Sequence, residues 1–96
     1  MHVILWRFCA RPGRESEFEA AYGDDGPWAR FFRGGDGYLG TELMRGSDGV
    51  YLTIDRWASA EAYRAFRETH ARRYAQLDAR FAELTIEETT LGELDV

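Results

Sequence analysis

His70 is the side chain of this sequence that is best suited to acid–base chemistry. It falls in the middle of a stripe of mostly aromatic residues that recur every three or four positions: Tyr63, Phe66, His70, Tyr74, Leu77 and Phe81. This spacing places the stripe on one face of a helix, which we expect to point inward. A histidine titrates near ~6.5, so one beside a substrate hydroxyl could act as a general base. The alternative is a core histidine whose ring nitrogens are satisfied by a tyrosine or a backbone carbonyl.

A second group of candidate residues is the aromatic cluster in the first half of the chain. Its members are Trp6, Phe8, Phe18, Tyr22, Trp28, Phe31 and Phe32. Large rings around a polar group suit an apolar, planar ligand, but a small core also uses such rings, so both interpretations stay open. The segment from Trp28 to Phe32 lies between Gly-rich stretches, and we predict that it forms the mouth of a pocket.

Two carboxylates fall inside predicted strands. Asp55 is followed by Arg56, and Glu42 lies on the preceding strand. We expect Asp55 to form an ion pair or hydrogen bond across a dimer rather than to act in catalysis, and Glu42 is open to the same two interpretations. An isomerase or a related proton-transfer enzyme would need one of these carboxylates near the pocket.

Several kinds of site are not expected. Cys9, His2 and His70 have no metal-ligand spacing, and the Gly34-to-Gly37 loop lacks the lysine of a P-loop, so we predict neither a metal nor a phosphate site. The net charge is -5 and the arginines are scattered, which disfavours nucleic-acid binding. The longest apolar run is too short for a membrane span or a signal sequence, so the expected location is cytoplasmic.

The elements that must position these side chains follow the order β-α-β-β-α-β, an α+β arrangement of the ferredoxin-like kind. The 96 residues fit one domain, which we assign to 1–96. We predict strands over 2–10, 38–45 and 50–57, helices over 14–22 and 28–33, one helix from an N-cap at Ser59 to about residue 80, and a last strand within 81–94.

The predicted sheet is apolar on both faces. On the first strand Val3 and Leu5 point one way, while Ile4, Trp6 and Phe8 point the other way. Helices can cover only one face, and a large apolar patch on the other face usually marks an interface. We therefore predict a homodimer that forms through the sheet faces.

One segment resembles the signature of a known family. Trp57, Ser59, Glu61, Ala62, Tyr63 and Phe66 are similar to the W-x-S-x-E-A-[YF]-x-x-F pattern of the antibiotic biosynthesis monooxygenase family. The order of the remaining elements fits along nearly the whole chain. The resemblance implies a four-stranded antiparallel sheet with helices on one face that pairs with a second copy as a dimeric α/β barrel.

The haem-degrading branch of this superfamily uses an Asn, a Trp and a His. The resemblance places these three positions at about Trp6, Phe66 and Gln76, and the chain contains no Asn at all. Haem degradation is therefore disfavoured.

The resemblance implies instead a cofactor-independent monooxygenase that acts on an aromatic or polyketide-like molecule in an apolar pocket. In that branch a deprotonated phenolic substrate reacts directly with oxygen. His70 and Tyr74 are the candidate catalytic residues, and the candidate substrate-binding residues are Trp6, Tyr22, Trp28, Phe32, Trp57 and Phe66. The alternative functions are a non-catalytic or stress-associated dimer that binds small apolar ligands, and an isomerase.

Overall fold

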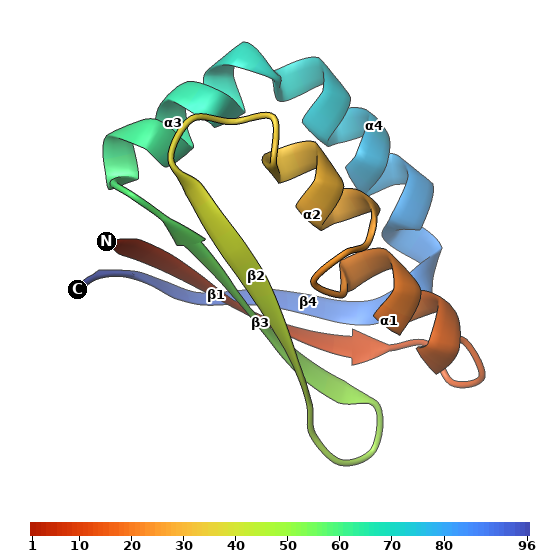
Figure 1. Cartoon of the computed structure of the whole chain (residues 1–96). Helices are drawn as coiled ribbons and strands as arrows, with labels where there is room; N and C mark the ends of the chain where they lie inside the picture. Colours follow the sequence, from red (N-terminus) through yellow and green to blue (C-terminus); the bar gives the residue numbers. More distant parts are fainter.

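The computed structural model describes residues 1–96 and has one antiparallel sheet with helices on a single face (Figure 1). The strands lie in the order β2-β3-β1-β4. This arrangement confirms the predicted ferredoxin-like fold. The elements are β1 (His2–Ala10), α1 (Glu15–Tyr22), α2 (Pro27–Phe32), β2 (Tyr38–Arg45), β3 (Val50–Trp57), α3 (Ala60–Thr69), α4 (Ala71–Phe81), a 3-10 turn (Ala82–Leu84) and β4 (Thr85–Asp95).

Strand β3 shows how the sequence pattern creates the two faces of the sheet. Its alternate residues Tyr51, Thr53, Asp55 and Trp57 are buried beneath the helices, and the residues between them are only half-buried. Successive side chains of a strand point to opposite faces, so a period of two in burial identifies the side that the helices cover. The neighbouring strand β1 pairs with β3 from His2 to Cys9 without a bulge, which carries the alternation across the centre of the sheet.

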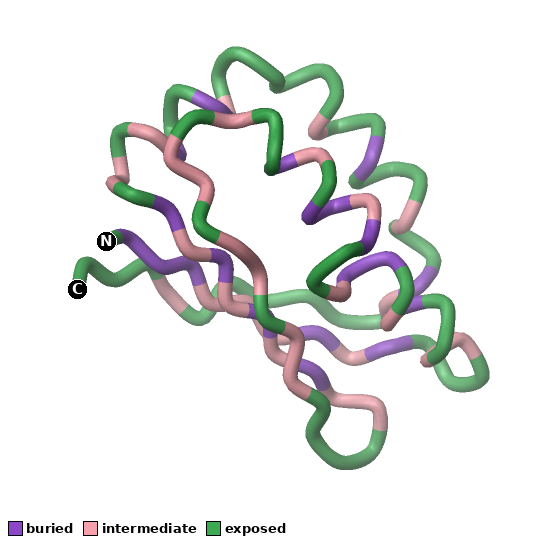
Figure 2. The backbone as a smooth tube through the Cα atoms, in the orientation of Figure 1, coloured by how far each residue is buried: buried purple, intermediate pink, exposed green.

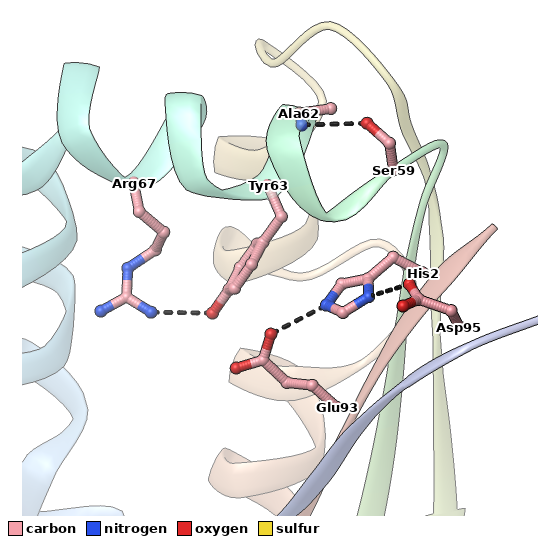
Figure 3. Close-up of polar contacts among 7 residues, drawn as sticks. All are labelled: His2, Ser59, Ala62, Tyr63, Arg67, Glu93 and Asp95. Atoms are coloured by element: carbon pink, nitrogen blue, oxygen red, sulfur yellow. Dashed lines mark hydrogen bonds and ion pairs between the residues drawn. The ribbon is translucent and has the colours of Figure 1, made fainter.

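The helical layer is anchored by aromatic side chains. Phe18 on α1 is fully buried, with its ring centroid 5.3 Å from Phe8 and 4.6 Å from Tyr51 on the sheet. Helix α3 begins where the sequence predicts, because the Ser59 hydroxyl accepts a hydrogen bond of 3.1 Å from the N–H of Ala62 (Figure 3).

The predicted single helix from Ser59 to about residue 80 is wrong. The chain forms two helices, α3 and α4, which meet at an angle at His70 (Figure 1). The backbone of His70 leaves the helical region, with φ -113° and ψ 28°. Hydrogen bonds from His70 N–H to Phe66 and from Tyr74 N–H to His70 still hold the two helices together. No helix of the structure is long and apolar enough to cross a membrane.

A polar cluster holds the end of β4 against β1 (Figure 3). His2 is buried, and its ring nitrogens contact Asp95 Oδ1 at 2.7 Å and Glu93 Oε1 at 2.8 Å. Hydrogen bonds to these two carboxylates raise the pKa of His2 above its ordinary value. This pairing explains why the last strand extends to Asp95, beyond the predicted range.

No helix covers the second face of the sheet (Figure 1). The backbone of β4 is mostly exposed, whereas β1 beside it is mostly buried (Figure 2). The register places a set of apolar side chains together on this uncovered face: Val3, Leu5, Cys9, Met44, Val50, Leu52, Ile54 and Leu94. Most of them are half-buried within the single chain.

Candidate functional site

A small cavity lies between the sheet and the helices. Its volume is about 30 Å³, roughly the share of liquid volume of one water molecule. All four strands and helices α1, α2 and α4 contribute side chains to its wall, so the fold brings together residues from most of the sequence. The lining residues are Trp6, Phe8, Tyr22, Trp28, Phe32, Thr41, Thr53, Asp55, Tyr74, Asp78 and Glu88.

Most of the predicted aromatic residues meet at this cavity. The structure places Trp6, Tyr22, Trp28, Phe32 and Tyr74 in its wall. Trp28 is the centre of the group, because its ring centroid lies 5.0 Å from Tyr74, 5.7 Å from Phe32 and 6.2 Å from Tyr22. These edge-on and tilted contacts are the arrangements that aromatic rings prefer. The segment predicted as a pocket mouth contributes Trp28 and Phe32 to the wall of this cavity.

Two predicted binding residues lie outside the cavity wall. Trp57 and Phe66 have ring centroids 5.2 Å apart, and both contact Phe32, which does line the cavity. Trp57 is fully buried. Both belong to the same hydrophobic core cluster as Phe32.

His70 does not occupy the inward face on which the sequence analysis places it. Because the helix breaks at His70, its side chain is exposed, and its ring contacts Phe66 at 4.6 Å and Phe31 at 6.1 Å between centroids. It belongs to a shallow surface depression beside Gly34 and Gly35, separate from the cavity. The structure therefore gives His70 no contact with the candidate site.

Asp55 is the one buried carboxylate of the cavity wall, with a relative exposure of 9%. The Thr41 hydroxyl donates a hydrogen bond of 2.6 Å to its Oδ1, and Thr41 in turn lies 2.6 Å from the Tyr38 hydroxyl. Burial raises the pKa of Asp55 to about 6, although the hydrogen bond from Thr41 opposes this shift. Asp55 is thus a protonatable group close to neutral pH inside an aromatic cavity.

The expectation that Asp55 pairs across a dimer is wrong. The side chain faces the helices, and its partner is Thr41 of the same chain. Glu42 lies on the uncovered face, where its carboxylate is 3.4 Å from the guanidinium of Arg56. The reason is the alternation of β3, which places Asp55 on the same side as the buried Trp57.

The Trp28 indole is an unpaired hydrogen-bond donor. Its Nε1 is buried and has no partner, and although the Tyr22 hydroxyl is close, the two do not meet the geometry of a hydrogen bond. A buried donor without a partner costs free energy. The indole N–H of Trp57, a residue outside the cavity wall, is unpaired in the same way. Two residues of the cavity wall thus carry buried polar groups, the indole N–H of Trp28 and the carboxylate of Asp55.

The remaining polar groups of the wall differ in ionisation. Burial raises the pKa values of Tyr22 and Tyr74 far above that of an exposed tyrosine, so both hydroxyls stay neutral and can donate hydrogen bonds. Burial also raises the pKa of Glu88. Its side chain, like that of Asp78, belongs to an exposed residue at the edge of the site.

Tyr74 separates the cavity from an open groove of about 640 Å³ that runs between the α3–α4 layer and β4. The Arg67 guanidinium lies over the Tyr74 ring at 3.9 Å from its centroid and donates a hydrogen bond of 2.7 Å to the Tyr63 hydroxyl (Figure 3). Tyr74 and Asp78 line both spaces. The cavity and the groove are therefore neighbouring spaces that share Tyr74 and Asp78.

Neither Asp55 nor Thr41 is among the site residues predicted from the sequence. No pattern in the sequence shows that Thr41 is the neighbour of Asp55, because the pairing of β2 with β3 contains an irregularity between Tyr38 and Gly40. The alternation of β3 was the available signal, since Asp55 shares a face with Trp57. No group of three or more His, Cys, Asp or Glu side chains is arranged to hold a metal ion.

These features define a ferredoxin-like α+β protein with an aromatic cavity between sheet and helices. The sequence profile of the antibiotic biosynthesis monooxygenase family matches residues 1–77. The chain belongs to this family. No curated protein sequence matches it significantly.

Solved structures of low sequence identity share the fold. A variant of SnoaB from Streptomyces nogalater, described as a cofactor-independent oxygenase, is 20% identical with a TM-score of 0.77, and the match covers 99% of this chain and 91% of that one. The monooxygenase ActVA-Orf6 from Streptomyces coelicolor, in complex with nanaomycin D, is also 20% identical with a TM-score of 0.77, covering 99% and 86%. A variant of MhuD with two manganese protoporphyrin IX molecules per active site is 23% identical with a TM-score of 0.75, covering 100% and 94%.

Proposed function

We propose that this protein is a cofactor-independent monooxygenase that oxidises an aromatic, polyketide-like molecule in the cavity between sheet and helices. Its membership of the antibiotic biosynthesis monooxygenase family supports this proposal. The observation that carries it is the cavity itself, in which an aromatic wall holds a buried carboxylate, Asp55, and an unpaired indole N–H, Trp28. An apolar pocket with a few convergent polar groups is the usual form of a small-molecule site.

The proposed reaction converts a ring methylene into a ketone. A proton leaves the CH₂ group, the resulting carbanion forms a C–O bond with O₂, and the peroxide anion that results takes up a proton. Loss of the second C–H proton and cleavage of the O–O bond then release water. The sum is R₂CH₂ + O₂ → R₂C=O + H₂O, in which the carbon is oxidised and O₂ is reduced. The protein has to bind the ring, accept and return a proton, and exclude other water.

The residues of the wall suit these tasks. Trp6, Trp28 and Phe32 offer ring faces and edges against which an aromatic substrate can pack. The Trp28 N–H and the neutral hydroxyls of Tyr22 and Tyr74 can donate hydrogen bonds to an oxygen on which negative charge develops. None of these groups needs to change its ionisation state.

Substrate binding requires the cavity to open. Its volume of about 30 Å³ is far below the roughly 300–1,000 Å³ typical of ligand pockets. We propose that Tyr74 swings away from Trp28 and joins the cavity to the groove beside Arg67, since Tyr74 lines both. The stacking of Arg67 on Tyr74 would hold the closed state.

We also propose that the protein acts as a homodimer through the uncovered face of the sheet. This face carries the apolar set that includes Leu5, Leu52 and Ile54 in the centre of the sheet. An apolar patch of this kind is costly in water and is commonly an interface. The helix-side cavity lies on the opposite face, so each copy would keep its own site.

Oxygen uptake tests the proposed function. Purified protein is incubated with 1,8-dihydroxyanthrone and other phenolic anthrones in an oxygen electrode, and quinone formation is followed by absorbance. We expect turnover above the protein-free rate, a loss of at least tenfold in Trp28→Ala, and no change in His70→Ala, because His70 lies outside the cavity. Absence of turnover across the panel would contradict the monooxygenase proposal.

Two other outcomes would identify the alternative functions. Thermal stabilisation by these ligands without any chemical change would favour a small-molecule-binding protein, because a ligand that binds only the native state raises its stability. Rearrangement of the substrate without oxygen uptake would favour an isomerase, for which Asp55 is correctly placed in the cavity wall. Haem degradation is not proposed, because the positions implied for its three polar residues hold Trp6, Phe66 and Gln76.

A further inference from the structure

The proposed reaction needs a proton acceptor, and few groups in the cavity wall can act as one. The Trp28 indole has no basic nitrogen, and Tyr22 and Tyr74 keep their protons. His70 lies on the surface in a separate depression. The wall therefore leaves only carboxylates as possible acceptors.

Three carboxylates line the cavity, and burial distinguishes them. Asp78 on α4 and Glu88 on β4 belong to exposed residues, so water competes for their oxygens. Asp55 on β3 is 9% exposed. A buried carboxylate is the stronger base, because desolvation disfavours its charged form.

The hydrogen bonds of Asp55 leave one oxygen available. Oδ1 accepts the hydrogen bond from Thr41 at 2.6 Å, and Thr41 is held by Tyr38 at 2.6 Å. Oδ2 accepts no hydrogen bond from the chain, and no arginine or histidine forms an ion pair with Asp55. One oxygen is therefore fixed by β2, and the other is free to meet a ligand in the cavity that Asp55 lines.

We propose that Asp55 is the proton acceptor of this site, taking a proton onto Oδ2 from the acidic methylene of an anthrone-type substrate. The inference rests on the proposed function for its substrate class. The C–H bond breaks, its electron pair stays on the substrate as an enolate, and the proton forms an O–H bond with Asp55. When the peroxide anion forms, the same proton returns to it, so Asp55 ends the cycle ionised. Thr41 and Tyr38 are positioning residues, because they act through Asp55.

The surroundings of Asp55 favour this role. The titratable side chains that face it come from five elements. They are Tyr38 on β2, Tyr63 on α3, Tyr22 on α1, Tyr74 and Asp78 on α4, and Glu88 on β4. The tyrosines are neutral, and no cation offsets the burial of the carboxylate. Asp55 is consequently more basic than an exposed aspartate and still ionised at neutral pH, as a general base requires.

Deuterium exchange without oxygen tests this assignment. The full chain is mixed with 1,8-dihydroxyanthrone in anaerobic D₂O, and loss of the methylene proton is followed by NMR at pH 7. We expect the wild type to accelerate exchange and Asp55→Asn to lose about 10²–10⁴-fold of that acceleration. The Asn variant keeps the acceptor for Thr41, so its shape and fold should persist, which circular dichroism and thermal unfolding would verify. Asp36→Asn, at an exposed aspartate outside the cavity wall, is the matched control and should stay within about threefold of wild type. Glu88→Gln tests the competing carboxylate of the wall.

The outcomes separate this inference from the proposed function. Exchange that depends on Asp55 but comes without oxygen uptake in air would support the proton acceptor and contradict the monooxygenase. Exchange that is unchanged in a folded Asp55→Asn, or that is lost in Glu88→Gln instead, would overturn the assignment. Absence of exchange in the wild type would overturn it as well. A second readout is the pH dependence, in which the wild-type rate should rise about tenfold from pH 5 to pH 7 and the residual Asn rate should not.

Discussion

The hydroxyl of Thr41 on β2 donates a hydrogen bond of 2.6 Å to Oδ1 of Asp55 on the adjacent strand β3. The contact is local to the sheet, but it fixes the only buried carboxylate of the cavity wall. A hydrogen bond to the charged form favours ionisation, whereas burial opposes it. The balance of these two effects places the pKa of Asp55 at about 6.

Removing the Thr41 hydroxyl should shift the pH profile of the reaction to higher pH. In Thr41→Val the carboxylate loses the hydrogen bond that lowers its pKa, so a larger fraction of Asp55 stays protonated near pH 6. We expect kcat/KM to fall several-fold at pH 6 and to recover at pH 8. Thr41→Ser keeps a hydroxyl and should retain the wild-type profile. An identical profile in all three proteins would contradict the positioning role of Thr41.

Asp55→Asn should stabilise the protein at high pH. The pKa of Asp55 is about 6 in the folded chain and 3.8 when exposed, which corresponds to about 3 kcal/mol. Because burial raises the pKa of Asp55, the wild type has its full stability below pH 3.8, where the carboxyl is protonated. It loses this contribution as the pH rises through 6 and the buried carboxyl ionises. The free energy of unfolding of Asp55→Asn should thus exceed that of wild type by about 3 kcal/mol at pH 8 and equal it near pH 3.5. Thermal unfolding across this range would measure the difference. If Asp55→Asn is instead less stable than wild type at pH 8, other interactions in the folded chain offset the cost of burying the charged carboxylate.

His2 should contribute stability at acidic pH. Its pKa is raised above 6.5 by Asp95 and Glu93, so its ion pairs stabilise the fold below pH 6.5 and lose their effect as the pH rises through the higher folded value. His2→Gln should lower the free energy of unfolding by only about 1 kcal/mol at pH 5.5, because Asp95 and Glu93 are exposed and water screens their interaction with His2. The difference from wild type should shrink by pH 9. A difference that does not vary with pH would mean that His2 contributes packing alone.

A charge on the uncovered sheet face should prevent dimer formation. Leu52 lies in the centre of this face, opposite Arg7 on β1 and Met44 on β2. Burial of an unpaired carboxylate at an interface costs several kcal/mol, so Leu52→Glu should be a monomer at ~10 μM. Ala79→Glu, on the exposed surface of α4, is the matched control. Light scattering should give twice 11.0 kDa for the wild type and the control, and a monomeric wild type would contradict the proposed dimer.

The elements that depend on local sequence patterns could be predicted closely. Strands β1, β2 and β3 have the predicted bounds, because they are rich in branched and aromatic residues and Gly or Pro lies close to most of their ends. The break at His70 could not be predicted, since neither Gly nor Pro marks it and the hydrophobic spacing continues through it. At the break, the rings of Phe31 on α2 and Phe66 on α3 pack against His70.

In the candidate site, too, some features could be predicted from the sequence and others could not. The aromatic wall was predictable because large apolar side chains such as Trp28 and Phe32 are usually buried. The polar groups were not, because their roles depend on the exact direction of each side chain. The break between α3 and α4 leaves His70 on the surface, and the alternation of β3 places Asp55 in the cavity wall.

Isotope labelling of the product tests whether the protein transfers an atom of O₂ to its substrate. The wild-type protein is mixed with 1,8-dihydroxyanthrone under ¹⁸O₂ in ordinary water, and the quinone is analysed by mass spectrometry after subtraction of the protein-free reaction. The cavity chemistry proposed for Asp55 and Trp28 predicts one ¹⁸O atom in the new ketone and the second in water. A product without label, or labelled product at no more than the protein-free rate, would contradict a monooxygenase.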